Sequence, residues 1–348
     1  MKTNPGRYFE DFHVGQVIEH PTPRTITVGD TALYLALTGS RFPLNSAEPF
    51  AHALGLPETP VDDWLLFHIV FGKTVPDVSL NAVANLGYAA GRFLAPAYVG
   101  DTIAARSEVI GLRQNSAGDT GTVYVRSIGL NQLGEPVLDY VRWVMVRKRD
   151  KASPAPEPVV PSLPDALPVD ALTVPDGLLP DGYDCDAVGS PWRWGDYAVG
   201  ERIDHVDGMT IEEAEHQLAA RLYQNNARVH FNQFEQGQGR FGRRLIYGGH
   251  VISLTRALSG NGLGNAFKIA GLNAGRHVAP CFAGDTVYAW SEVIAAEPLP
   301  GRTDLGALRL RTYGLKNQPA AGFPGRTQAG GYDPAVILEL DYWALMPR

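Results

Sequence analysis

Two adjacent glycines, Gly248 and Gly249, stand at the start of a predicted helix that continues with apolar residues at helical spacing. The first N–H groups of a helix have no partner within it, and glycine lets a ligand approach the backbone closely. Such donors stabilise an oxyanion that develops at a reacting carbonyl group. The pair therefore predicts an oxyanion site, with an ordinary helix entry as the alternative.

Two of the nine histidines flank these glycines in the sequence. His230 follows a predicted amphipathic helix, and histidine suits proton transfer near neutral pH. We therefore interpret His230 as an acid–base candidate, against a purely structural role. His250 directly follows Gly249, where the helix dipole favours a neutral imidazole. For His250 packing or capping is the default interpretation, and catalysis is the alternative.

Four arginines are candidates for holding an anion. Arg92 and Arg276 occupy the same position in two matching stretches of the chain, and Arg243 and Arg244 precede the glycine turn. Arginine binds phosphates and carboxylates in bidentate fashion. The alternative for the first pair is an ion pair with a carboxylate that is also repeated, such as Asp101, and for the second pair a solvated surface position.

The matching stretches belong to a duplication that covers the chain. Residues 81–110 align without a gap to residues 265–294, and 16 of the 30 positions are identical. A second block, around 11–20 and 196–205, agrees at almost the same offset. The chain is therefore predicted to be a tandem repeat of one domain, packed as a pseudo-dimer that imitates a two-fold homodimer.

Residues 150–192 separate the two repeats and hold nine of the chain's 26 prolines. Proline removes backbone donors and blocks helix, so this segment is predicted to be an extended linker. Leu167, Leu178 and their apolar neighbours could fasten it to the surface as a strap. The predicted domains are therefore 1–149 and 193–348, with the linker between them.

Each repeat is predicted to begin with helices and to end with strands. In the second repeat Thr210 and Glu213 have the spacing of a capping box. Apolar residues then form one stripe of a helix, namely Ile211, Ala214, Leu218 and Leu222. A further helix is predicted in each half, around 64–71 and after Gly249. Alternating patterns predict the strands 102–112, 122–130, 137–146, 286–294, 306–315 and 336–346. This order predicts an α+β fold, with a long helix packed on a curved antiparallel sheet.

Composition excludes several classes of protein. The 348 residues carry a net charge of −7 and no cluster of Lys and Arg, which argues against nucleic-acid binding. Two cysteines, Cys185 and Cys281, cannot build a disulfide framework or a four-thiolate metal site. No run of 18 apolar residues and no signal-like N-terminus is found, so a cytoplasmic protein without a membrane span is expected.

The Gly100-Asp101-Thr102 and Gly284-Asp285-Thr286 strings, each after Ala-Pro and before alternating strands, resemble the hot-dog fold of MaoC-like hydratases. Longer strings, such as 71–77, 140–149 and 245–250, are similar to the mesaconyl-CoA hydratases of that family, also called β-methylmalyl-CoA dehydratases. The resemblance implies a tandem, or double, hot-dog fold, in which each half is a curved antiparallel sheet wrapped around a long helix.

The resemblance also assigns roles to individual residues. His230 falls on the catalytic histidine of the family, and Gly249 falls on the glycine whose N–H holds the thioester oxygen. Tyr247 and Gly248 would then contact the substrate. Arg243 and Arg244 are candidates for contacts with coenzyme A phosphates, and Arg92 and Arg276 for contacts with those phosphates or with a substrate carboxylate. In the first repeat the matching positions hold Ser40, Asn45 and Trp64, so that half is expected to shape the substrate pocket without catalysing.

One position departs from the family pattern. Asn225 stands where the family has a catalytic Asp, and an amide cannot exchange a proton as a carboxylate does. Either His230 acts alone while Asn225 orients water or the substrate hydroxyl, or a carboxylate comes from elsewhere. Asp62 and Asp63 are the first candidates for that carboxylate, Glu215 is a weaker one, and the free carboxylate of the substrate is a third option.

The resemblance implies a hydro-lyase that interconverts β-methylmalyl-CoA and mesaconyl-CoA, with coenzyme A as part of the substrate and with neither metal nor cofactor. The alternatives are another MaoC-type enoyl-CoA hydratase, an acyl-CoA thioesterase, and a non-catalytic acyl-CoA-binding protein. The expected partners are the thioester and a second copy of the chain in a homodimer. Neither nucleic acid nor a membrane is expected as a partner.

Overall fold

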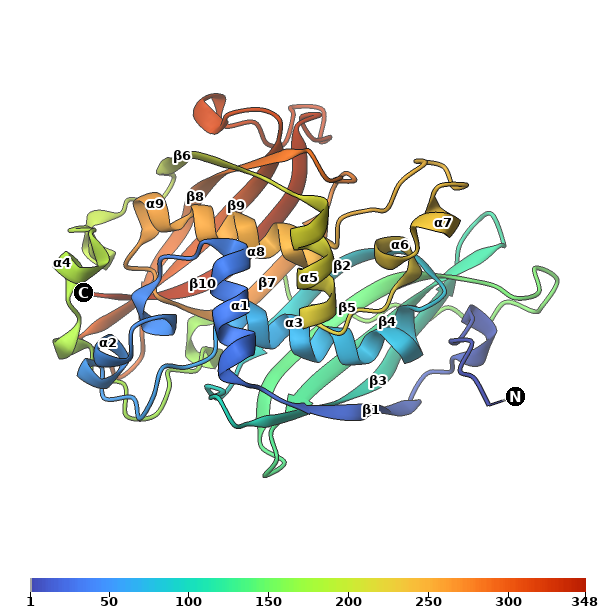
Figure 1. The fold of residues 1–348 in the computed structure, drawn as a ribbon, viewed down its shortest axis with the longest axis horizontal. Helices are drawn as coiled ribbons and strands as arrows, with labels where there is room; N and C mark the ends of the chain where they lie inside the picture. The colour runs from blue at the N-terminus through green and yellow to red at the C-terminus, as the bar shows by residue number, and fades with distance from the viewer. Residues whose placement is uncertain (1) are drawn as a thin grey trace.

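The computed structural model describes residues 2–348 and contains one antiparallel sheet of ten strands (Figure 1). The strand order across the sheet is β1-β3-β4-β5-β2-β7-β10-β9-β8-β6. The strands span β1 (Val17–Thr25), β2 (Ala82–Phe93), β3 (Thr102–Gln114), β4 (Thr120–Leu130), β5 (Pro136–Arg147), β6 (Arg202–Thr210), β7 (Lys268–His277), β8 (Thr286–Pro298), β9 (Leu305–Lys316) and β10 (Val336–Pro347). The first five come from one repeat and the last five from the other, so the duplication appears as two half-sheets.

The two half-sheets join through β2 and β7, whose register shows a local two-fold relation. Tyr88 pairs with Gly275, and Gly91 pairs with Leu272. In the sequence duplication, Tyr88 corresponds to Leu272 and Gly91 corresponds to Gly275. Exchanging the two halves therefore turns the Tyr88–Gly275 pair into the Leu272–Gly91 pair, as a two-fold axis requires. The predicted pseudo-dimer is therefore realised as one continuous sheet.

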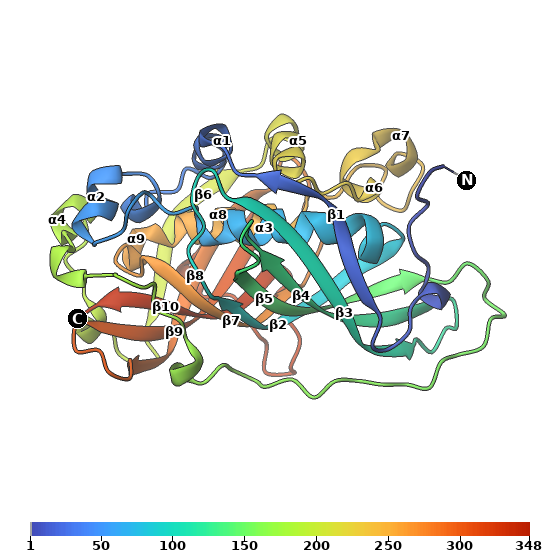
Figure 2. The ribbon, with the colours of Figure 1, turned by 90° about the horizontal axis from the view of Figure 1, so that it is seen from below.

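Helices cover one face of the sheet, in two layers (Figure 2). The inner layer is α3 (Asp63–Thr74) and α8 (Gly248–Leu258), and the outer layer is α1 (Val28–Thr38) and α5 (Glu213–Leu222). All residues of α3 after the first are buried, because this helix has neighbours on every side. The short helices are α2 (Glu48–Ala53), α4 (Cys185–Val188), α6 (Arg228–Phe231), α7 (Gln233–Gln236) and α9 (Gly260–Leu263). Among residues 2–348, no helix is both long enough and apolar enough to cross a membrane.

All six predicted strands are present, each within a few residues of its expected ends. Residues 131–134 form the turn between β4 and β5. There the Asn131 side-chain oxygen accepts the N–H groups of Leu133 and Glu135, and Gly134 adopts a φ of +77°. Alternation and turn chemistry are local signals, so they survive into the folded chain. The predicted α+β class with a curved antiparallel sheet is confirmed.

The prediction for the start of α5 was wrong. Thr210 ends β6, where its hydroxyl bonds to the hydroxyl of Thr286, and the capping box is formed by Glu212 and Glu215. The predicted apolar stripe was also misplaced, because Ala214 and Leu218 are exposed. The buried face carries instead His216, Ala219, Ala220 and Leu222. His216 takes the place of an aliphatic residue on this face, and its ring accepts a backbone N–H of the site described below.

The linker runs along the face of the sheet opposite the helices (Figure 2). Leu167 and Leu178 are buried, and the Leu167 backbone bonds to the side chains of Asn273 and Trp343. Leu179, a predicted foothold, is 61 % exposed. Residues 185–188, which contain no proline, form α4, so the segment is not extended throughout. The strap is otherwise present as predicted.

Candidate active site

The N-terminus of α8 presents two backbone donors. Tyr247 precedes the helix, and its own N–H donates to Nε2 of His216 at 2.8 Å. The N–H groups of Gly248 and Gly249 meet no acceptor among residues 2–348. Unpaired N–H groups at a helix start carry the positive end of the helix dipole, so they suit an oxyanion.

The two glycines are required by their surroundings. A Cβ at Gly249 would lie 2.3 Å from a ring carbon of Tyr247 and 2.6 Å from Cε1 of His68. A Cβ at Gly248 would lie 2.3 Å from Cε1 of His277. Aromatic and imidazole rings therefore close around the helix start, and only glycine fits between them.

His230 lies on α6, and its ring is fixed in one tautomer. Nδ1 is 3.0 Å from the carbonyl oxygen of Leu245. A carbonyl only accepts, so Nδ1 carries the proton and Nε2 keeps its lone pair when the ring is neutral. Burial lowers the pKa of His230 to about 4, and the ring is 5.5 Å from that of Tyr247. His230 is therefore an unprotonated base near pH 7, beside Tyr247, the residue that precedes α8.

Asn225 lies in the turn that follows α5. Its backbone N–H donates to Ala220, and its side-chain oxygen accepts the N–H of Ala227 at 3.1 Å. The residue is 1 % exposed, so it is fixed in place. Because the amide oxygen is engaged, the NH₂ group is the part left to donate to a water or hydroxyl oxygen.

Four further histidines surround this arrangement, namely His68, His216, His250 and His277. Burial lowers the pKa of each of them, so all are neutral near pH 7. His68 comes from α3 of the first repeat, and its Nε2 is 2.9 Å from Oγ of Ser253. Despite the clustering, no group of three His, Cys, Asp or Glu side chains within 2–348 is arranged to hold a metal ion.

His68 lies within the predicted helix 64–71 and is buried, but sequence reasoning missed its contact with the α8 start. It also overlooked His216 and His277. A signal was present, because the duplication matches His216 to Thr31 and His277 to Phe93. Polar residues that only one repeat carries mark the half in which chemistry is possible. His250 is buried, and its two ring nitrogens have no hydrogen-bond partner among residues 2–348, so it neither caps the helix nor bonds to His230.

The carboxylates proposed as substitutes lie elsewhere. Asp62 caps α3 through the N–H groups of Trp64 and Leu65, and burial, with the neighbouring Asp63, raises its pKa to about 6. Asp63 forms an ion pair with Lys268, and exposed Glu215 serves the capping box of α5. Within residues 2–348, no hydrogen bond or ion pair connects any of the three to His230.

The four arginines are not gathered at the α8 start. Arg92 forms an ion pair at 2.6 Å, as one alternative held, but its partner is Asp139 and not Asp101. Arg276 is exposed and lines a cavity of about 300 Å³ together with arginines of β9. Because successive residues of a strand face opposite sides, and His277 faces Gly248, this cavity lies on the other face of the sheet.

Arg243 and Arg244 flank the site without entering it. Arg243 is exposed and stacks 4.0 Å from the ring centroid of Phe282. Arg244 pairs with Glu213 and donates to the carbonyl oxygen of Phe231, next to His230. Arg244 therefore fastens α6 to α5, whereas Arg243 is free to contact an anion.

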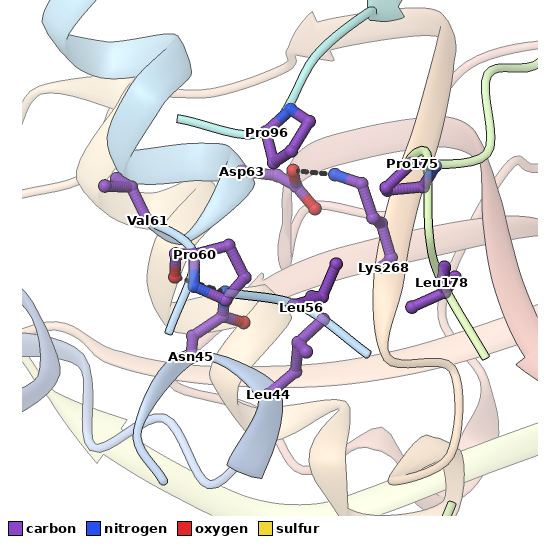
Figure 3. Close-up of a pocket in the computed structure, with 10 residues that line it drawn as sticks. All are labelled: Leu44, Asn45, Leu56, Pro60, Val61, Asp63, Pro96, Pro175, Leu178 and Lys268. Carbon is purple, nitrogen blue, oxygen red and sulfur yellow. Dashed lines mark hydrogen bonds and ion pairs between the residues drawn. The ribbon is translucent and has the colours of Figure 1, made fainter. Parts of the chain in front are cut away.

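The first repeat keeps the outline of the same site without its chemistry (Figure 3). Asn45, in the position of His230, donates to the carbonyl oxygen of Pro60 at 3.1 Å, as His230 does to Leu245. Asp63 stands in the position of Gly248, and its pair with Lys268 fills the space. The remaining cavity is about 10 Å³, enough for roughly one water molecule. This half has no imidazole at that position and no room for an acyl group.

Comparison with known proteins identifies relatives over the whole chain. The family model described as mesaconyl-CoA hydratase matches residues 2–330. A β-methylmalyl-CoA dehydratase of Chloroflexus aurantiacus is 63 % identical, and the match covers 100 % of this chain and 99 % of the relative. A mesaconyl-CoA hydratase of Cereibacter sphaeroides is 58 % identical, with 100 % of both chains covered.

Solved structures agree with the fold. A crystal structure from Chloroflexus aurantiacus, described as a putative MaoC domain protein dehydratase, is 63 % identical, with a TM-score of 0.98 over 100 % of this chain and 99 % of that one. A Mycobacterium tuberculosis protein described as having a double hotdog fold is 26 % identical, with a TM-score of 0.77 over 99 % of each chain. The predicted double hot-dog fold is confirmed.

Proposed function

Because the chain belongs to the mesaconyl-CoA hydratase family, we propose that it interconverts β-methylmalyl-CoA and mesaconyl-CoA. The reaction is the reversible addition of water to a branched C5 dicarboxylic enoyl thioester, so the protein is a hydro-lyase. The observation that carries the proposal is the neutral His230, with a free Nε2, beside the unpaired N–H groups at the start of α8.

The α8 N-terminus acts on the thioester oxygen. When hydroxide adds to the β-carbon, the electrons of the double bond move toward the thioester carbonyl, and negative charge develops on its oxygen. The N–H of Gly249 donates to that oxygen, with Gly248 as a second donor. Stabilisation that is greater in the transition state than in the ground state lowers the barrier.

His230 moves the proton. Nε2 takes a proton from water as the oxygen bonds to the β-carbon, and the imidazolium then returns that proton to the α-carbon. The double bond is consumed, and one water molecule is gained. Dehydration is the same path in reverse, with the proton leaving the α-carbon first. One base is sufficient, because it is regenerated in every cycle.

Asn225 completes this arrangement as a donor. Its NH₂ group donates to the oxygen of the attacking water, or of the departing hydroxyl, and so orients the lone pair toward the β-carbon. This role needs no proton exchange, which explains how an amide can stand in the position of the family Asp. The thioester itself activates the double bond, so the proposal includes neither a metal nor a cofactor.

The proposal is tested by incubating the purified protein with mesaconyl-CoA and following the products by mass spectrometry. We expect a gain of one water, its disappearance in His230→Ala, and no free thiol with a thiol-reactive dye. Release of free coenzyme A would instead identify a thioesterase. Binding of the thioester without turnover would identify a non-catalytic acyl-CoA-binding protein, and turnover of other enoyl-CoA esters alone would identify a different MaoC-type hydratase.

We further propose that the protein is a homodimer and works in the cytoplasm. The two ends of the ten-stranded sheet, β1 and β6, are unpaired edges that carry exposed Val17 and Val206. Such edges favour association with another copy. The two cysteines are free thiols, as is usual in a reducing compartment. Light scattering on the purified protein tests the dimer, and a mass of one chain, 37.7 kDa, would contradict it.

A further inference from the structure

A fully buried arginine of the first repeat has no carboxylate partner in the described part of the chain. Arg142 lies on β5 and is 0 % exposed. Its terminal nitrogens donate to the hydroxyl of Thr74 at 2.7 Å and to that of Ser79 at 3.4 Å, while Nε–H has no acceptor among residues 2–348. Arginine keeps its charge when buried, and an uncompensated buried charge is unfavourable. The positive charge of Arg142 is therefore not neutralised by any carboxylate among residues 2–348.

The carboxylates that lie close in the sequence to Arg142 and to Ser79 already form ion pairs with other residues. Asp139, three residues earlier, binds Arg92 and Arg126. Asp77, near Ser79, binds Arg7 and His20. The groups that face the guanidinium are instead neutral: the phenols of Tyr88, Tyr140 and Tyr247, and the ring of Phe71.

The fold does not need a cation at this place. The neighbouring tryptophans, Trp143 and Trp343, match between the repeats, so the position of Arg142 corresponds to Tyr342. The strand register agrees. Arg142 pairs with Tyr88, and Tyr342 pairs with Leu272, which is the residue that corresponds to Tyr88 in the second repeat. In the second repeat a neutral phenol, bonded to the hydroxyl of Thr312, therefore fills the same position.

Arg142 also lies next to the site. Its Cζ is 4.3 Å from the ring centroid of Phe71, and that ring is 5.6 Å from the ring of Tyr247, which precedes α8. The residue opposite Arg142 in β2, Tyr88, bonds to Nε2 of His277, the ring that packs on Gly248. A charge at Arg142 is therefore separated from the oxyanion donors by one layer of aromatic side chains.

We propose that Arg142 binds the free carboxylate of the dicarboxylic acyl group and so determines the substrate class. This inference rests on the proposed function, because it deepens the description of the same site. A carboxylate would supply the missing negative charge and accept the unpartnered Nε–H in a bidentate contact. An acyl group with a methyl in place of the carboxylate would leave the cation unpaired and would be rejected.

The test compares thioesters that differ only in this group. Fumaryl-CoA and crotonyl-CoA are a reactive pair, with a carboxylate or a methyl at the same carbon, and succinyl-CoA and butyryl-CoA are the corresponding unreactive pair. We expect the wild-type protein to favour the carboxylate member by about 100-fold in kcat/KM and in Kd. Arg142→Met should reduce both preferences to near unity, chiefly by weakening binding of the charged thioester.

Two further variants control for folding and for bulk charge. Arg142→Lys keeps the charge but not the planar fork, so a preference of about 10-fold should remain even if Arg142→Met is unstable. Arg106→Met removes an exposed arginine of β3 in the same repeat and should leave the preference unchanged. Melting temperatures accompany each measurement, and we expect Arg142→Met to melt no lower than the wild type, because a well-packed apolar side chain tolerates this position better than an unpaired charge.

The outcomes separate this inference from the proposed function. A preference that survives in Arg142→Met, or an equal loss for both members of each pair, would overturn the role of Arg142 even if mesaconyl-CoA is hydrated. A different result is that mesaconyl-CoA is not hydrated, although binding of succinyl-CoA depends on Arg142. The proposed reaction would then be wrong, and the proposed carboxylate-binding role of Arg142 would be supported.

Discussion

At the scale of single residues, His230 is distinguished by what its two ring nitrogens do. One is fixed by the carbonyl oxygen of Leu245, and the other is left free. We expect His230→Ala to lower kcat for hydration by about 10²–10⁴-fold, the usual contribution of a general base. Asn45→Ala, at the matching position of the first repeat, is the control and should leave kcat unchanged. A comparable loss in both variants would show that the halves share the chemistry.

The same residue predicts the pH dependence of hydration. Burial lowers the pKa of His230 to about 4, and only the neutral ring accepts a proton from water. In steady-state measurements, kcat/KM should therefore be constant from pH 8 to about 5 and should fall below pH 5. An acid limb centred near 6.5, the ordinary value for histidine, would mean that the base is exposed or is a different residue.

Gly249 carries the second residue-scale prediction. The Cβ of Gly249→Ala would meet Tyr247 at 2.3 Å and His68 at 2.6 Å, so the helix start must move and the oxyanion donor with it. We expect kcat to fall by about 10²–10³-fold, the effect of losing one oxyanion donor. Gly260→Ala, at the start of α9, meets nothing closer than 3.8 Å and should retain activity. Full activity in Gly249→Ala would exclude its N–H from catalysis.

At the scale of elements, α5 positions α8 through one contact. Nε2 of His216 accepts the N–H of Tyr247, the residue before the oxyanion donors. His216→Phe leaves this N–H buried and unpaired, which should reduce the free energy of unfolding by about 1–3 kcal/mol. We also expect kcat/KM to fall by about 10-fold, because displaced donors meet the developing charge less well.

His216→Gln distinguishes positioning from bulk packing. The amide oxygen of glutamine accepts the same N–H, so this variant should recover much of the activity that His216→Phe loses. Denaturant unfolding and steady-state kinetics on both variants provide the measurement. Equal losses in the two variants would show that the imidazole contributes by its shape alone.

At the scale of the whole molecule, the five histidines around the site, whose pKa values are all lowered, link stability to pH. Burial lowers the pKa of His230, His250 and His277 to about 4 each, and His68 and His216 are lowered as well. Above pH 6.5 both folded and unfolded chains hold these rings neutral, so they have no effect on stability. Below pH 6.5 the unfolded chain binds more protons, so the folded chain is progressively disfavoured until pH falls through the folded pKa values.

We therefore expect the free energy of unfolding to decrease between pH 7 and pH 5, by about 1–2 kcal/mol for each such histidine. Urea denaturation at several pH values measures this slope. The ring of His250 makes no hydrogen bond to residues 2–348, so His250→Phe should fold. The variant should lose the contribution of this one histidine to the pH dependence of the free energy of unfolding. A slope that is flat between pH 7 and pH 5 would contradict the burial of these rings.

The sequence by itself determined the repeating parts of this protein. The duplication, the six predicted strands, the long helices and the linker are encoded in alternation, proline content and internal identity, which are local signals. His230 and the Gly248–Gly249 pair were found in the same way, because their spacing in one segment resembles a family pattern. The cap of α5 was misassigned because two acidic residues, Glu212 and Glu215, compete with Thr210 for the role, and only the pairing of β6 with β8 decides between them.

Only the tertiary structure decided which residues from distant segments meet. His68 and Ser253, 185 positions apart, touch because they occupy equivalent places on α3 and α8 beside the local two-fold axis. His277 reaches Gly248 through the pairing of β7, and Arg142 lies beside the site because β5 pairs with β2. Sequence spacing carries no information about such contacts, since they arise from sheet register and helix packing between the repeats. The structure likewise showed that Asp62 and Asp63 are engaged in a helix cap and an ion pair, which their place in the sequence left open.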